Sequence, residues 1–154
     1  MGLSNTFGTD KGLEKNGVVQ DYGTTRIRIA RAGGSNMAYT RAMERLFRPH
    51  RRQSQAGTLE EIVAMRLLRE AYAESVIMSW ETKTGTDEQG NDIWEHGISP
   101  EDAGHEPSDK LLPVNKDTIM AVFNTLPDLF LDLKAQAESL NTFKLEVMEA
   151  DAKN

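Results

Sequence analysis

The segment from Thr58 to Trp80 constrains the fold more than any other part of the sequence, because its apolar residues recur with helical spacing over a long run. These residues cover about half of the helix circumference, and a stripe of that width needs more than one packing neighbour. Thr58 and Glu61 have the spacing of a capping box, which predicts that the helix begins at Thr58. We therefore expect this helix at the centre of the core.

Length and composition favour one domain covering residues 1–154. A chain of 154 residues buries roughly 68–70% of its surface on folding, so it can form a core without covalent cross-links. The sequence has no cysteine, which excludes disulfides, thiolate zinc sites and a cysteine nucleophile. No run approaches the ~20 apolar residues of a membrane-spanning helix. We expect a soluble protein of a reducing cytosol with no membrane partner.

The N-terminal part predicts a β-hairpin. Residues 1–16 are polar and contain glycine, which indicates an irregular lead-in. Two strand candidates follow, residues 17–22 and residues 25–31. In the second, Ile27 and Ile29 alternate with arginines, and this period of two is typical of a half-buried strand. Together the two strands predict a hairpin.

The rest of the chain is mainly helical in pattern. Ser35 or Asn36 can cap a helix that ends before Pro49, and residues 49–58 have the composition of a linker. Pro127 suits the first turn of the last helix. We therefore expect an α+β fold, mainly α, in which the N-terminal β-hairpin packs on a bundle of about four helices. These helices are expected at residues 37–48, 58–80, 115–124 and 128–150.

The acidic segment 81–114 lacks helical periodicity. Gly90 and Asn91 predict the tip of a hairpin that carries Trp94 on its return strand, and the remainder predicts a flexible acidic loop. An EF-hand with Gly90 at its sixth position would place glycine, glutamine and histidine at three ligand positions, which excludes that motif. A solvated loop is favoured over an irregular metal site, and its role stays open.

Arginines are concentrated in one block although the net charge of the chain is −6. Residues 26–52 hold eight arginines and one acid, Glu44. Nucleic-acid-binding modules usually have a basic pI and aromatic platforms, whereas this chain has a pI near 5.1 and a strongly acidic second half. We favour arginines that pair with acids of this subunit or a neighbouring one. A nucleic-acid-binding protein that uses Arg26–Arg52 is the alternative.

Four of these arginines predict a charged ridge along the helix of residues 37–48 and just beyond it. Their spacings of four, three and four residues place them on one side of a helix. A single exposed ion pair contributes only ~0–1 kcal/mol. The ridge can therefore contribute appreciable binding energy only if its arginines act together, in a network or in a repeated interface. We therefore expect it to serve self-association. The ridge comprises Arg41, Arg45, Arg48 and Arg52.

No pattern of catalytic residues is present in the sequence. The three histidines lie in the predicted linker or in the acidic segment, and no nucleophile elbow, P-loop or zinc-protease motif occurs. Gly33, Gly34 and Ser35 lead from a strand to a helix, but the third glycine of a dinucleotide fingerprint is missing. A turn with a helix cap is the favoured interpretation. We expect no enzymatic activity, no cofactor and no metal.

Three stretches resemble the tail assembly chaperones of long-tailed bacteriophages: "DYGTTRIRIARAGG", "EIVAMRLLREAYAESVIMSWE" and "LPDLF". The resemblance extends over nearly all of the chain. It implies a non-enzymatic chaperone, made late in infection in the host bacterial cytoplasm, that coats the tape measure protein and promotes polymerisation of the tail tube. It also implies self-association and absence from the mature virion.

Apolar helix faces and methionines could bind the tape measure protein, which would be the client of such a chaperone. A tape measure protein exposes apolar helical surface before its tube is built, and the flexible side chains of the seven methionines can adapt to varied partners. The last predicted helix is amphipathic and supplies the candidate apolar face. Its residues are Leu129, Phe130, Leu133, Leu140, Phe143 and Val147.

The resemblance further implies a second, longer product made by −1 ribosomal frameshifting, through which the tail tube protein becomes a partner. Ala152, Lys153 and Asn154 can be encoded by GCA-AAA-AAC, which contains the slippery heptamer A-AAA-AAC. The codons of the gene test this expectation.

Overall fold

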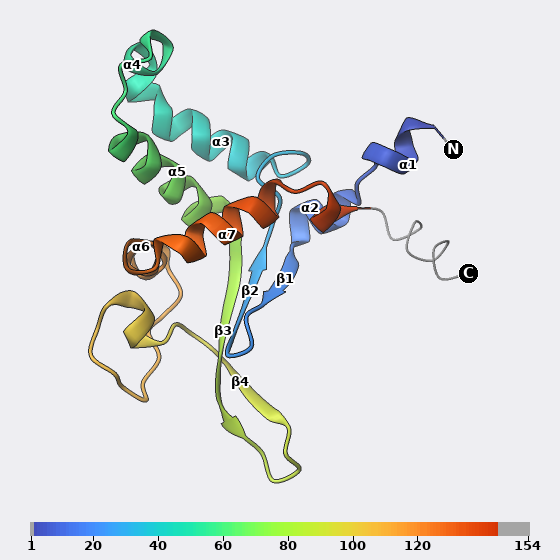
Figure 1. Cartoon of the computed structure of the whole chain (residues 1–154), viewed down its shortest axis with the longest axis vertical. Helices are drawn as coiled ribbons and strands as arrows, with labels where there is room; N and C mark the ends of the chain where they lie inside the picture. Colours follow the sequence, from blue (N-terminus) through green and yellow to red (C-terminus); the bar gives the residue numbers. More distant parts are fainter. Residues whose placement is uncertain (1, 145–154) are drawn as a thin grey trace.

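The computed structural model describes residues 2–144 and has an α+β fold, as expected. Four antiparallel strands form one sheet in the order β1-β2-β3-β4 (Figure 1). The predicted N-terminal hairpin is present, with Val18 opposite Ile29. The strands are β1 (Val18–Asp21), β2 (Thr25–Ile29), β3 (Ile77–Thr86) and β4 (Asp92–His96).

Helices cover one face of this sheet and extend beyond it (Figure 1). The α-helices are α1 (Leu3–Phe7), α2 (Lys11–Asn16), α3 (Met37–Phe47), α4 (Arg51–Ala56), α5 (Glu61–Ser75), α6 (Lys116–Thr125) and α7 (Pro127–Glu138). Short 3-10 helices are η1 (Arg48–His50), η2 (Pro100–Ala103) and η3 (Asn141–Phe143). Residues 2–16 and 49–58 are thus more helical than the sequence indicated.

The central helix is shorter at both ends than predicted. The N-cap of α5 is Glu60, and the hydroxyl of Thr58 donates to the carbonyl oxygen of Gln53 at 3.4 Å, so the predicted capping box is wrong. At the other end α5 stops at Ser75, and β3 begins at Ile77 without an intervening loop. Pairing with β2 overrides the helical pattern there, because it lets Trp80 lie opposite Ile27 on the buried face of the sheet.

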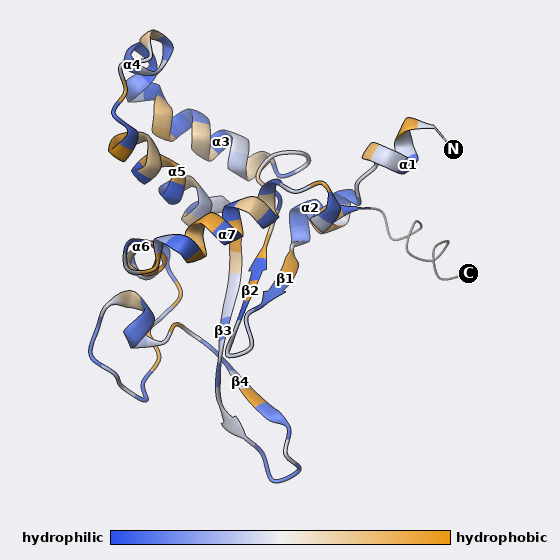
Figure 2. Cartoon of the chain, viewed as in Figure 1, coloured by the Kyte–Doolittle hydropathy of each residue, from blue (hydrophilic) through white to orange (hydrophobic). Residues whose placement is uncertain are grey.

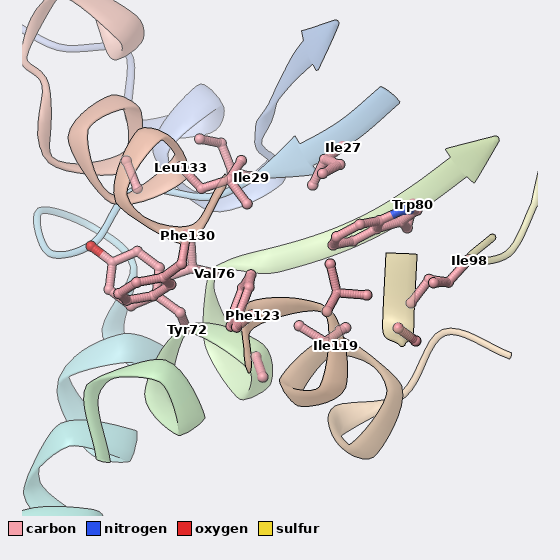
Figure 3. Packing of buried hydrophobic residues seen from close by; sticks show 14 residues of the cluster. Ile27, Ile29, Tyr72, Val76, Trp80, Ile98, Ile119, Phe123, Phe130 and Leu133 are labelled. Atoms are coloured by element: carbon pink, nitrogen blue, oxygen red, sulfur yellow. The ribbon is translucent and has the colours of Figure 1, made fainter. Parts of the chain in front are cut away.

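The core lies between the sheet and helices α5, α6 and α7 (Figure 3). Four aromatic rings form a continuous series within it, with centroids 4.9–5.7 Å apart and edge-to-face or tilted geometry. The series consists of Tyr39, Tyr72, Phe130 and Phe123. Ile27, Ile29 and Trp80 supply the buried surface of the sheet.

The acidic segment contains more regular structure than predicted. The hairpin tip near Gly90 and Asn91 is confirmed, with β3 and β4 on either side of it. The following residues form a loop closed by the bridge between Ile98 and Leu112, which exchange two backbone hydrogen bonds of 2.9 and 2.8 Å. The predicted hairpin is therefore present and projects from the sheet, and the remainder, which was expected to be a flexible loop, is a loop closed by this bridge.

The last helix ends earlier than its amphipathic pattern predicted. Ser139 is extended and terminates α7, and the chain then turns so that Phe143 is fully buried. The carbonyl of Phe143 accepts a hydrogen bond of 2.9 Å from the backbone N–H of Asp10, and Lys144 forms a bridge with Thr9. This contact with the N-terminal segment replaces the continued helix. Predictions for residues 145–154 lie outside the described residues.

Candidate partner-binding surfaces

The first part of the arginine block stabilises the β-hairpin and the turn after it. Arg26 lies 3.6 Å from Asp21 and its guanidinium stacks over the ring of Trp94, 3.9 Å from the centroid. Arg28 donates to the carbonyl of Gly17 at 3.2 Å. The pairing prediction is therefore confirmed for Arg26.

Arg31 forms the most buried ion pair, with Glu14 of α2, whose side chain is only 2% exposed. The carboxylate accepts hydrogen bonds from Arg31 at 2.5 Å and from Thr9 and Ser35 at 3.0 Å each. Burial acts to raise the pKa of Glu14, but these hydrogen bonds and the positive charge of Arg31 outweigh it and hold the pKa below its ordinary value. We call Glu14 and its three partners the Glu14 latch.

Gly34 allows the latch to close. Its φ is +53°, and a Cβ at this position would lie 1.9 Å from a carboxylate oxygen of Glu14. The glycines of residues 33–34 therefore serve close packing rather than phosphate binding, which agrees with the turn predicted there. Asn36 follows as the N-cap residue of α3, but its side-chain amide donates to the carbonyls of Arg31 and Ser75 instead of capping the helix.

The predicted arginine ridge is only partly paired. Arg45 pairs with Glu74 of α5, which also binds Lys116 of α6 at 2.6 Å, so this acid joins three helices. Arg48 pairs with Glu44 at 3.1 Å within the same stretch.

Arg41 and Arg52 are exposed and form no ion pair within residues 2–144. Arg51 is likewise exposed and unpaired in that range. We call the surface of α3, η1 and α4 that carries Arg41, Arg45, Arg48, Arg51 and Arg52 the basic knob.

The apolar residues predicted to bind a partner mostly face inward. Phe130 and Leu133 point into the core (Figure 3) and, like Phe143, have no exposed surface. Leu129 is partly buried and packs against the core. Leu140 lies after the end of α7 and is half-buried. In this structure these side chains stabilise the monomer, and Val147 lies outside the described residues. The exposed apolar surface of the described residues lies on other elements.

Such a surface lies in a groove of about 810 Å³ between α5 and α6. Ile62 is 76% exposed beside it, and Val63, Met65 and Met120 also line it. Charged side chains of both signs, including Arg66 and Asp117, complete the lining. The signal in the sequence was the position of Ile62 and Val63 outside the main apolar stripe of the helix.

The acidic segment forms the counterpart of the basic knob. Residues 86–109 contain eight acids and neither lysine nor arginine, and of these acids only Asp92 forms an ion pair, with Lys83, among the described residues. We call this part, the tip of the β3–β4 hairpin and the loop after it, the acidic arm. It lies at the opposite end of the molecule from α4 (Figure 1), and its residues are predominantly hydrophilic (Figure 2).

Residues 2–144 contain neither a metal-binding cluster nor a membrane-spanning helix. No group of three or more acidic or histidine side chains there has the geometry to hold a metal ion. None of the helices described is long and apolar enough to cross a membrane.

Comparison with known protein families gives a match over most of the chain. A family model described as YdaY prophage protein matches residues 33–154. No curated protein and no solved structure matches the chain.

Proposed function

The chain belongs to the YdaY prophage protein family and is thus a phage protein, and on this premise we propose that it is a tail assembly chaperone. In this proposal it has no enzymatic activity and acts in the host bacterial cytoplasm. It coats the tape measure protein, promotes polymerisation of the tail tube and is absent from the finished virion. The phage origin and the resemblance of the sequence to such chaperones support the proposal.

The groove between α5 and α6 is the structural observation that carries the proposal. Amphipathic helices bind in apolar grooves through side chains on one face, and an unassembled tape measure protein is expected to expose such faces. Met65 and Met120 in the lining are flexible enough to adapt to different apolar side chains. The charged rim can pair with the polar flanks of a client helix.

Co-expression with the tape measure protein of the same phage tests the proposal. We expect the two proteins to co-purify, and Ile62→Lys to abolish capture because it places a charge beside the groove. Since Ile62 is 76% exposed, the substitution should leave folding intact. Ile93→Lys, at an exposed apolar position on β4, is the matched control and should retain capture. Equal capture by both variants would contradict the groove as the client site, and binding of DNA instead of the client would contradict the function.

A longer frameshifted form that contacts the tail tube protein is part of the same proposal. Reading the codons of Ala152 to Asn154 tests it directly. AAG for Lys153 or GCC for Ala152 would remove the slip site.

A further inference from the structure

Two surfaces of opposite charge, whose side chains are for the most part without an ion pair within residues 2–144, lie toward opposite ends of this molecule. The basic knob is carried by α3, η1 and α4, and the acidic arm by the β3–β4 hairpin and the loop after it (Figure 1). Because the two surfaces lie at opposite ends of the longest axis, one chain cannot bring its own knob against its own arm. Each surface therefore has a complementary partner on a second copy of the same chain.

We infer that copies of this protein associate head to tail, with the basic knob of one copy bound to the acidic arm of the next. A contact between two different surfaces of identical subunits leaves one of each free, so it can repeat and produce an open-ended row. The inference deepens the proposed function, since a row of copies is what coating an elongated client requires. Copies should therefore associate through these two surfaces even when the tape measure protein is absent.

A second copy explains both surfaces, whereas a nucleic acid explains only one. A DNA or RNA backbone could neutralise Arg41, Arg51 and Arg52, but it would leave the acids of residues 86–109, of which only Asp92 has an ion pair among the described residues, without a partner. The projecting position of the acidic arm also favours contact with a second copy. Acids on a hairpin that extends away from the core can reach a neighbouring molecule without rearrangement of either fold.

The contact is expected to be weak and sensitive to salt. Exposed charges separated by more than the Debye length are screened, and this length falls from about 10 Å at about 0.1 M salt to about 3 Å at about 1 M. Sedimentation velocity of the purified protein without client should show a sedimentation coefficient that rises with concentration at the lower salt. At the higher salt we expect monomer at all concentrations.

Charge reversal locates the interface. The knob variant Arg41→Glu/Arg52→Glu changes two side chains that have no ion pair within residues 2–144, so it should fold normally and lose association. The arm variant Glu88→Lys/Glu95→Lys should do the same. A control variant, Lys11→Glu/Lys15→Glu, makes the same change in net charge as the knob variant on exposed residues of α2 and should still associate.

Mixing the two variants provides the decisive measurement. The acidic knob of the knob variant can then bind the basic arm of the arm variant. The basic knob of the arm variant can likewise bind the acidic arm of the knob variant. Association should therefore return in the mixture, although neither variant associates by itself. Undiminished association of the knob variant, equal loss in the control variant, or no recovery in the mixture would each overturn the inference. Failure of the proposed client function would appear separately, as loss of tape measure capture by proteins that still form rows.

Discussion

The arginines of residues 26–31 and those of residues 41–52 belong to one basic block in the sequence but have different surroundings in the fold. Arg26 and Arg31 contact acids of the chain, and Arg31 reaches an almost fully buried carboxylate. Arg41 in the middle of α3 and Arg52 in α4 are exposed and form no ion pair in residues 2–144. A dense run of one charge in a sequence thus does not define one surface, because strands and helices distribute its members over different faces.

The largest expected effect in this comparison comes from Arg31→Ala. Removing Arg31 leaves the carboxylate of Glu14 buried without its charged partner, and breaking a buried pair in this way costs about 3–5 kcal/mol. Urea unfolding followed by circular dichroism measures the change in the free energy of unfolding. A loss below about 1 kcal/mol would mean that the Glu14 latch is not a stabilising contact.

A somewhat smaller effect is expected for Gly34→Ala. The new Cβ would collide with the Glu14 carboxylate, and the alanine would have to adopt a positive φ. Backbone strain of this kind costs about 1–3 kcal/mol. Gly57→Ala is the matched control, since Gly57 has a φ of +71° but nothing within 4 Å of the added carbon. The difference between the two variants in thermal unfolding isolates the collision. Equal destabilisation would show that the close approach at Gly34 has no energetic consequence.

The latch also predicts a dependence of stability on pH. The pKa of Glu14 is lower in the folded protein than its ordinary value of 4.5, so the folded state favours the charged form. Its contribution to stability is complete above the unfolded-state pKa and is lost as pH falls through the lower, folded-state pKa. The difference in unfolding free energy between the wild type and Glu14→Gln should therefore shrink as the pH is lowered below about 4.5. A difference that stays constant over that range would exclude ionised Glu14 as its source.

The exposed arginines are expected to have the smallest effects on stability. Arg45→Ala removes one ion pair of Glu74, which keeps Lys116, and should cost about 0–1 kcal/mol. Arg52→Ala should change the unfolding free energy by no more than about 0.5 kcal/mol. Chemical denaturation of both variants, measured beside Arg31→Ala, checks the order. If Arg52→Ala destabilised the protein as much as Arg31→Ala, the two halves of the block would not differ in their contribution to stability.

The sequence predicted those elements whose pattern is decided locally. The alternation of Ile27 and Ile29 was enough to predict β2, and the Gly90-Asn91 turn was enough to predict the second hairpin. The boundary at Ser75 was not predictable in this way, because residues 76–80 suit a helix as well as a strand and only pairing with β2 decides between them. The end of α7 depends similarly on the contact of Phe143 with the N-terminal segment.

The candidate surfaces were predicted less well than the fold. An amphipathic pattern identifies an apolar face but not whether that face meets the core or a partner, and Phe130 and Leu133 meet the core. Nothing in the sequence around Glu14 marks it as buried, since its partner Arg31 is seventeen residues away. The sequence predicted the arginine ridge, but it could not show which of its members lack an ion pair, because that depends on where the fold places the surrounding acids.

The direct passage from α5 into β3 couples parts of the molecule that lie far apart. A flexible connector would absorb a rotation of the helix, but Val76 alone separates Ser75 from the first residue of the strand, and its carbonyl is held by the N–H of Ala30 at 2.8 Å. The direction of β3, and with it the position of the hairpin tip, is therefore tied to the orientation of α5.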